Sequence, residues 1–245
     1  MTVHHPVFAR AFERVSRAMD AGGFAELRVR LLDGLSGTVV DVGAGNGLNF
    51  PHYPATVEHV IAVEPEPYLR RRAEADARTA PIPIDVVDGT AEHLPLPDRS
   101  CEAVVFSLVL CSVADQPRAL AEAFRVLRPG GRLGVSDIVA EDELTADQRA
   151  ERGSHVGCVA GALPTREYRD RLASAGFVDI SITLTTHHPV AQGMHSAIIR
   201  AAKPAVTCCG VVGCCAPGEH PADLALTVEQ AKHAAGCGCT RPDES

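Results

Sequence analysis

Cysteine is the residue type in this sequence whose number and spacing most directly suggest chemistry. Six of the nine cysteines lie within the last 38 residues, four of them in AVTCCGVVGCC (205–215) and two in GCGC, at Cys237 and Cys239. Soft metals and metalloids select thiolate ligands over oxygen ligands. In a reducing compartment this cluster predicts metal, metalloid or redox chemistry ahead of structural disulfides.

The composition and the first residues favour a reducing compartment and argue against nucleic acid or a membrane as partner. With 245 residues, 46% of them hydrophobic, the chain is long enough for one sizeable α/β domain. A net charge of −8 argues against nucleic-acid binding, and no run of about 18 apolar residues predicts a membrane span. The first 20 residues have the spacing of a helix and no continuous apolar segment typical of a signal peptide, so we expect a cytoplasmic protein.

Apolar runs that alternate with helical patterns predict the elements that position these residues. Helices are expected over residues 1–34, with an apolar face made by Phe8, Phe12, Val15 and Met19. The buried strands are predicted at 37–42, 58–67, 82–89, 101–110 and 131–140, followed by two closing strands at 178–186 and 194–203. Because no helix separates the closing strands, we expect them to pair antiparallel at one edge of a doubly wound, mostly parallel sheet.

The glycine-rich stretch DVGAGNG, residues 41–47, follows the first strand and is predicted to turn tightly into a helix. Its glycines let the backbone approach a ligand, in the spacing GxGxG instead of the GxGxxG that seats a pyrophosphate. Asp41 would repel a pyrophosphate but suits a cationic or amine-bearing ligand. Glu64, at the end of the second strand, is placed to accept hydrogen bonds from ribose hydroxyls. These features favour a nucleotide site, and a purely structural tight turn is the alternative.

Four motifs carry a family resemblance. VVDVGAGNG (39–47), AVEPEP (62–67), DGTAEHLPLPD (88–98) and RVLRPGGRL (125–133) resemble the successive motifs of class I S-adenosylmethionine-dependent methyltransferases. The resemblance covers about residues 35–203 and implies a Rossmann-like fold: a seven-stranded sheet with an antiparallel last strand and helices on both faces. We therefore divide the chain into N-terminal cap helices (1–34), a methyltransferase core (35–203) and a Cys-rich tail (204–245).

By position, the resemblance implies a set of residues that bind the methyl donor. The donor's methionine moiety would be lined by Asp41, Gly43, Ala44, Gly45 and Gly47. Its ribose would be held by Glu64 beside Pro65, its adenine bordered by Thr90, Ala91 and Glu92, and its sulfonium faced by Ser107 and Leu108. The family usually has Asp where Thr90 stands, so the adenine contact there is expected to differ.

The acceptor is indicated by a second resemblance. Before residue 131 the chain is similar to small-molecule methyltransferases, including thiol-methylating enzymes, through SLVLCSVADQPRALAEAFRVLRPGG (107–131). From residue 131 it resembles bacterial arsenite methyltransferases, through SDIVAEDELT (136–145), GCVAGAL (157–163) and GMHSAIIRAAKP (193–204). In that family the cysteine of GCVAGAL binds As(III), which implies a catalytic and ligand role for Cys158.

The resemblance is incomplete in its cysteines. The arsenite enzymes carry further cysteines in the N-terminal region and near the last strand, whereas residues 1–100 contain none, and Ser196 and Ala197 occupy the last strand. We expect the tail to supply the missing As(III) ligands, from Cys208, Cys209, Cys214 and Cys215. The alternatives are a tetrahedral Zn(II) site that includes Cys237 and Cys239, or a scavenging appendage without a catalytic part. A separate alternative for Cys158 is a small buried apolar residue, and we expect Cys101 and Cys111 to lie in the core or the pocket wall.

The resulting hypothesis is a cytoplasmic, monomeric arsenite methyltransferase. It would need no metal for catalysis and would use arsenite or its thiol conjugates, with glutathione or thioredoxin as reductant. One alternative is a small-molecule thiol or hydroxyl methyltransferase. The other is a metalloid- or metal-sequestering protein whose methyltransferase core is degenerate.

Overall fold

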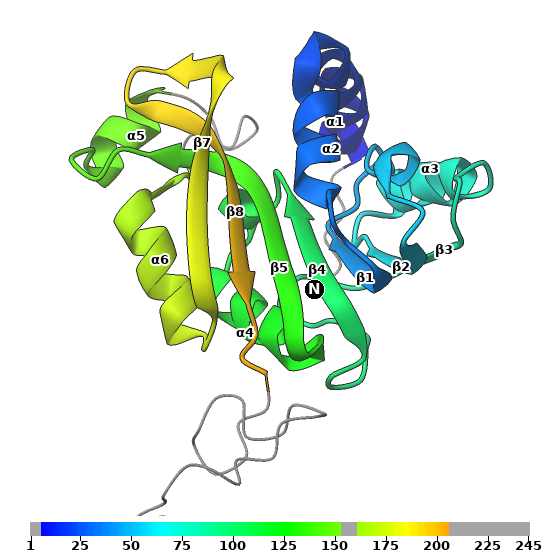
Figure 1. The fold of residues 1–245 in the computed structure, drawn as a ribbon. Coiled ribbons are helices and arrows are strands. Elements are labelled where there is room, and N and C mark those ends of the chain that lie inside the picture. The colour runs from blue at the N-terminus through cyan, green and yellow to red at the C-terminus, as the bar shows by residue number, and fades with distance from the viewer. Residues whose placement is uncertain (1–5, 153–160, 206–245) are drawn as a thin grey trace, which may run out of the picture. The chain divides into compact units, whose positions relative to one another are not determined.

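The computed structural model of the protein describes residues 6–152 and 161–205 (Figure 1). Cys158 and the cysteines from Cys208 onward lie outside these residues. In the part of the chain that is described, no helix is both long and apolar enough to cross a membrane.

Two helices precede the sheet, α1 (Pro6–Met19) and α2 (Ala25–Leu32), joined by the kinked segment Asp20–Phe24, in which Gly23 has a φ of 114°. The helical prediction for this region is confirmed. The predicted apolar face is wrong at Val15, which is 47% exposed, whereas Ser16 is buried. The inward side of α1 instead carries Ser16, whose hydroxyl donates to Oδ1 of Asn46 in the polar glycine loop at 3.5 Å.

Eight strands form one sheet in the order β3-β2-β1-β4-β5-β8-β7, with β6 paired to β5 beside this path. Their bounds are β1 Gly37–Val42, β2 Val57–Val63, β3 Ile84–Val87, β4 Cys101–Ser107, β5 Leu127–Ala140, β6 Leu163–Pro164, β7 Val178–Ala191 and β8 Met194–Ala202. Only β8 runs antiparallel to its neighbours, β5 and β7. The predicted α/β fold class is confirmed, and the two-residue β6 adds one strand to it.

Four further helices surround the sheet: α3 (Pro67–Ala77), α4 (Gln116–Val126), α5 (Ala146–Arg152) and α6 (Thr165–Ser174). The sequence fixes two of their starts through a carboxylate cap followed by proline in the first turn. The Glu66 side chain accepts from the amides of Tyr68 and Leu69, and the Asp115 side chain accepts from the amide of Arg118.

The predicted helix after the glycine loop is absent from this segment of the structure. Residues 45–49 form turns, and only a short 3-10 helix, Phe50–His52, lies between β1 and β2. The glycines favour turns, and Pro51 and Pro54 lack the amide hydrogen that a helix interior requires. The predicted strand 101–110 also ends early, at Ser107, because Leu108 has a φ of 59°.

Alternate residues of the central strands pack into two separate cores. Val40 and Val42 of β1 belong to a cluster with residues of α4 and α6, such as Leu120 and Leu172. Val39, which points to the opposite face of the sheet, belongs to a cluster with Leu31, Leu32 and Ala73 of α2 and α3. Asp41 has the same parity as Val39, so its side chain lies on the sheet face that α2 covers.

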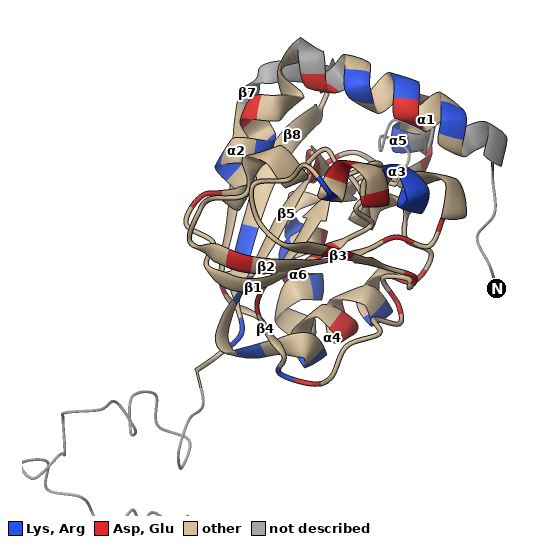
Figure 2. Cartoon of the chain, turned by 90° about the vertical axis from the view of Figure 1, so that its right-hand side faces the viewer, with Lys and Arg blue, Asp and Glu red and all other residues tan. Residues whose placement is uncertain are grey.

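Polar and charged side chains connect α1 and α3, which lie side by side (Figure 2). Glu13 of α1 accepts a hydrogen bond of 2.6 Å from the Tyr68 hydroxyl and lies 3.2 Å from Nε of Arg72. The guanidinium groups of Arg10 and Arg72 also lie 5.6 and 5.5 Å from the centre of the Tyr68 ring. These contacts position the N-terminal helices over the glycine loop.

Candidate functional site

The carboxyl ends of β1, β2 and β4 meet at one edge of the sheet, where α1 and α2 also lie (Figure 1). Val42 is in register with Val63 of β2 and with Phe106 of β4. Open α/β sheets bind ligands outside this edge. The glycine loop, Glu64 and Ser107 follow these strands directly, so three predicted groups of site residues are brought together.

The backbone of the glycine loop has a conformation that would strain residue types other than glycine. Gly43, Gly45 and Gly47 have φ values of 67°, 60° and 84°. A Cβ atom on Gly43 would lie 2.7 Å from both methyl carbons of Val109, and one on Gly47 would lie 2.7 Å from the Phe50 ring. The amides of Gly43 and Ala44 both donate to the carbonyl of Val63, at 2.8 and 3.1 Å. The loop is therefore held tightly against the end of β2.

Asp41 is buried next to this loop, with 1% of its surface exposed. Its two carboxylate oxygens accept hydrogen bonds of 3.1 and 3.0 Å from Nδ2 of Asn49. Burial raises the pKa of Asp41 to about 6, and the Asn49 hydrogen bond and the Arg28 charge oppose that rise. At neutral pH the group is mostly ionised and would gain from a bound cation.

Glu64 lies on the other side of the loop, directly after β2. Its Oε2 accepts from the Gly45 amide at 2.8 Å and its Oε1 from the Glu66 amide at 2.9 Å. The pKa of Glu64 is raised, chiefly by burial, against the effect of these two bonds. Each carboxylate oxygen can accept a second hydrogen bond, so the group can also receive ligand hydroxyls. Pro65 is half-buried beside it, and its carbonyl accepts from Nη1 of Arg70 at 3.2 Å.

The predicted adenine-bordering residues follow β3 in a tight turn. Thr90 forms an isolated bridge with His93, and Ala91 is buried in the core with the α4 residues. Glu92 is half-buried, and its carbonyl accepts from Nε of Arg118 at 3.3 Å.

Ser107 and Leu108 mark the end of β4. Leu108 is one of three non-glycine residues with a positive φ among those described, and its amide donates to the Ser136 carbonyl at 2.8 Å. Left-handed backbone costs a non-glycine residue about 1–2 kcal/mol and concentrates at functional sites. The turn at Leu108 thus supports the prediction that these residues border a ligand.

Two residues of this edge were missed by the sequence reasoning. Arg28 of α2 and Asn49 after the loop are both buried, and Nη1 of Arg28 donates to Oδ1 of Asn49 at 2.8 Å. Asn49 lies two residues after the predicted ligand loop and two before Pro51. This position next to the loop could have marked it as a candidate site residue. Arg28 is one of several arginines in the predicted N-terminal cap helices, and nothing in its spacing distinguishes it from the others.

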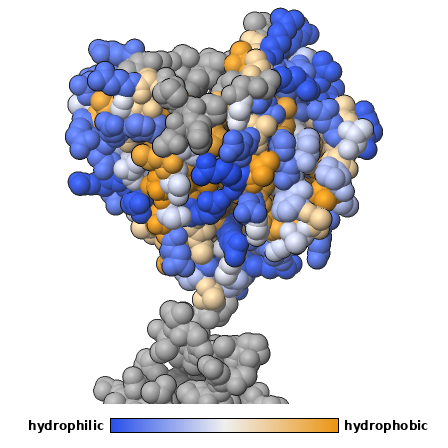
Figure 3. All heavy atoms as spheres, turned by 45° about the horizontal axis from the view of Figure 1, so that its top comes forward, coloured by the Kyte–Doolittle hydropathy of each residue, from blue (hydrophilic) through white to orange (hydrophobic). Residues whose placement is uncertain are grey.

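Another buried carboxyl, Asp137 of β5, lies next to an apolar group that includes Cys111, Ile138 and Met194. It accepts hydrogen bonds from the amides of Cys111 and Ile138, both at 2.9 Å. Burial raises the pKa of Asp137 to about 6, and these hydrogen bonds oppose the rise. Viewed obliquely from this end of the sheet, apolar side chains gather between hydrophilic margins (Figure 3).

We expect the raised pKa of Asp137 to make the protein less stable as pH rises. The folded state holds this proton more tightly than the unfolded chain, so the stabilisation is present below pH 4 and is lost as pH rises to about 6. Two units of pKa correspond to about 3 kcal/mol. Between pH 4 and pH 7, Asp137→Asn should therefore gain up to about 3 kcal/mol of unfolding free energy relative to wild type.

Denaturant unfolding at several pH values measures this difference. Asp142→Asn is the control, because hydrogen bonds from Arg166 and Thr165 lower the pKa of that exposed carboxyl below 3.8, so its difference from wild type should stay nearly constant from pH 4 to pH 7. A constant difference for Asp137→Asn from pH 4 to pH 7 would contradict the prediction.

The predicted thiol ligands fall outside the described residues: Cys158, Cys208, Cys209, Cys214 and Cys215. Of the remaining cysteines, Cys101 and Cys111 are buried free thiols, as predicted. Burial raises the pKa of Cys101 to about 12, so it stays protonated. Within residues 6–152 and 161–205, no group of three His, Cys, Asp or Glu side chains could hold a metal ion.

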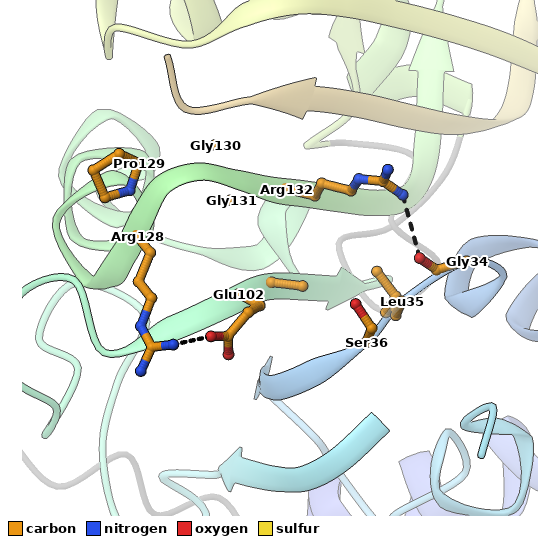
Figure 4. A pocket seen from close by; sticks show the side chains of 10 residues that line it. Gly34, Leu35, Ser36, Glu102, Arg128, Pro129, Gly130, Gly131 and Arg132 are labelled. Carbon is orange, nitrogen blue, oxygen red and sulfur yellow. Dashed lines mark hydrogen bonds and ion pairs between the residues drawn. The ribbon is translucent and has the colours of Figure 1, made fainter. Parts of the chain in front are cut away.

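A hollow of about 380 Å³ lies at the opposite end of the sheet (Figure 4). Its two arginines already have partners: Arg128 is ion-paired with Glu102, and Nη1 of Arg132 donates to the Gly34 carbonyl at 3.2 Å. The hollow lies at the amino ends of β1 and β4, whereas the glycine loop follows the carboxyl end of β1. We therefore place the candidate site at the carboxyl edge.

Residues 40–135 match the sequence profile of a family described as a methyltransferase domain. An arsenite methyltransferase of Halobacterium salinarum is 32% identical over 151 residues, which are 59% of this chain and 38% of that protein. A thiol S-methyltransferase of Homo sapiens is 36% identical over 119 residues, which are 46% of this chain and 48% of that protein. The chain thus spans less than half the length of these two curated relatives.

Solved structures agree on the fold. A methyltransferase of Thermotoga maritima, described as a possible histamine N-methyltransferase, has a TM-score of 0.61 and 25% identity, over 80% of this chain and 98% of that one. An arsenic (III) S-adenosylmethionine methyltransferase of Chlamydomonas reinhardtii has a TM-score of 0.56 and 23% identity, over 69% of this chain and 64% of that one. The chain therefore contains a methyltransferase domain, built on the fold of the S-adenosylmethionine-dependent methyltransferases.

Proposed function

We propose that this chain transfers a methyl group from S-adenosylmethionine to trivalent arsenic. The choice of S-adenosylmethionine as donor rests on the pair of buried carboxyls, Asp41 and Glu64, on either side of the glycine loop. S-adenosylmethionine fits these residues, because it combines cationic groups with ribose hydroxyls. Asp41 would face the positive charge, and Glu64 would accept from the ribose hydroxyls. When bound, the donor supplies a methyl group on a positively charged sulfur.

The task of the protein is placement and exclusion of water. Methyl transfer requires the acceptor atom, the methyl carbon and the sulfur to be aligned, with the reacting atoms about 3–3.5 Å apart. The loop residues and Glu64 would fix the donor on one side, while Ser107 and Leu108 would border the reacting sulfur. The N-terminal helices cover this edge, and Phe12 lies next to Gly45.

Arsenic as acceptor is supported by the resemblance of residues 131–204 to arsenite methyltransferases and by the 32% identical relative of that name. Trivalent arsenic carries a lone pair without a proton, so no general base is needed. The thiolates of Cys158 and of the tail cysteines would replace its hydroxyls and hold it in place. Glutathione or thioredoxin would keep these thiols reduced, as expected of a cytoplasmic enzyme.

A small-molecule thiol is the second candidate acceptor. It is favoured by the 36% identity to a thiol S-methyltransferase. In this case the acceptor would have to lose its proton, and Cys158 would be dispensable.

We expect the purified, reduced protein to convert arsenite to methylated arsenic when given labelled S-adenosylmethionine and glutathione. Chromatography with arsenic-specific detection measures the product, and a parallel reaction contains a small alkyl thiol without arsenite. If only the alkyl thiol becomes labelled and no methylated arsenic forms, the thiol is the acceptor and the arsenic proposal is wrong. A protein that binds no donor in calorimetry would contradict both and favour a sequestering role.

A further inference from the structure

Arg28 occupies a central place at the carboxyl edge, although it comes from an N-terminal helix. Its Nε donates to Oδ1 of Asp20 at 2.7 Å. Its Nη1 donates to Oδ1 of Asn49 at 2.8 Å and to the Ser107 hydroxyl at 3.0 Å. One guanidinium thus joins α2, the segment after the glycine loop and the end of β4.

Part of this guanidinium has no partner among the described residues. An arginine side chain carries five N–H donors. The three hydrogen bonds above use Nε and Nη1, and none of the described residues accepts from Nη2. The Arg28 side chain as a whole is 10% exposed. Asp20 already supplies one anionic partner at Nε, and a carboxylate of a ligand could accept from the remaining guanidinium donors.

Asn49 places this cation next to the anion of Asp41. The Asn49 amide accepts from Arg28 through Oδ1 and donates to Asp41 through Nδ2 at 3.0 Å, so the two charges fix its orientation. A positive and a negative group therefore lie one amide apart, beside the loop. The amino-acid end of S-adenosylmethionine carries the complementary pair, a carboxylate and an ammonium group.

We propose that Arg28 binds the carboxylate of the donor's methionine moiety while Asp41 faces its ammonium group. The two residues would then recognise the zwitterion as a unit, with Asn49 as the positioning residue between them. This inference rests on the proposed use of S-adenosylmethionine and adds a specificity-determining residue to that site. It also gives α2 a direct part in donor binding.

The test compares S-adenosylmethionine with decarboxylated S-adenosylmethionine, which lacks only the carboxylate. We expect wild type to bind the intact donor about 10- to 100-fold more tightly in calorimetry, the range of a charge-assisted hydrogen-bonded contact. Arg28→Gln should reduce this ratio to about 1–3, mainly by weakening the intact donor. Arg30→Gln, two residues further along α2, is the matched control and should keep the wild-type ratio.

The ratio within each protein separates recognition from folding, and circular dichroism checks the fold of each variant. If Arg28→Gln does not fold, Arg28→Lys keeps the charge but loses the forked geometry, so its ratio should be intermediate. A wild-type ratio near 1, or an unchanged ratio in a folded Arg28 variant, would overturn the inference and leave the proposed function intact. If wild type binds neither S-adenosylmethionine nor its decarboxylated form, both the inference and the proposed function are wrong.

Discussion

Replacing Gly43 by alanine is expected to abolish donor binding and to lower the unfolding free energy by about 2–5 kcal/mol. The alanine would have to keep a φ of 67°, and its Cβ would lie 2.7 Å from both methyl carbons of Val109. Left-handed backbone costs about 1–2 kcal/mol, and forcing the neighbouring side chain aside costs about 1–3 kcal/mol. The loop that the donor needs would shift in either case. Denaturant unfolding and calorimetry with S-adenosylmethionine measure the two effects.

Gly130→Ala is the control for this experiment. Gly130 has a similar φ of 78°, but a Cβ atom there would meet nothing within 4 Å. It lies at the other end of the sheet, where its amide donates to the Lys203 carbonyl. Gly130→Ala should therefore cost only about 1–2 kcal/mol and bind the donor as wild type does. Equal donor binding by the two variants would show that crowding at the loop does not matter.

Replacing Cys158 by serine should reduce arsenite methylation by about 100-fold or more, the scale expected when the acceptor is misplaced. A serine hydroxyl is a hard oxygen ligand and holds trivalent arsenic poorly. Donor affinity should stay at the wild-type value, because the proposed donor contacts lie elsewhere. Initial rates with arsenic-specific detection, together with calorimetry, measure both quantities.

Cys101→Ala separates this effect from the general loss of a thiol. Cys101 is fully buried at the start of β4, and its pKa of about 12 keeps it protonated, so its removal should leave the rate unchanged. A Cys158→Ser enzyme that methylates arsenite at the wild-type rate would remove arsenic from the proposal and favour the thiol acceptor.

The parts of the site that the sequence revealed are those fixed by local spacing. The loop glycines and Asp41 lie within seven residues, and Glu64 immediately follows an unmistakable buried strand. In a parallel sheet, the ends of neighbouring strands meet at one edge, so these residues converge once the strands are recognised. The fold class followed from the same alternation of strands and helices.

The parts that the sequence did not reveal depend on contacts between distant residues. Arg28 reaches Asn49 across 21 positions and Ser107 across 79, and such pairs have no periodic signal. The missing helix after the loop is a different error, because Pro51 and Pro54 were visible and were given too little weight. Val15 was misplaced because the side of α1 that faces the protein carries Ser16, which contacts the polar glycine loop, and this leaves Val15 exposed.

The position of β8 has a consequence for the order in which the chain can fold. This strand is almost the last part of the core to be synthesised, yet it lies inside the sheet and pairs with β5 from Arg132 to Ala140. Until residues 194–202 have left the ribosome, β5 presents an open edge to other chains, and β7 has no strand to join. We therefore expect the nascent chain to be prone to aggregation during this interval, and a chaperone that covers the β5 edge to raise the yield of folded protein.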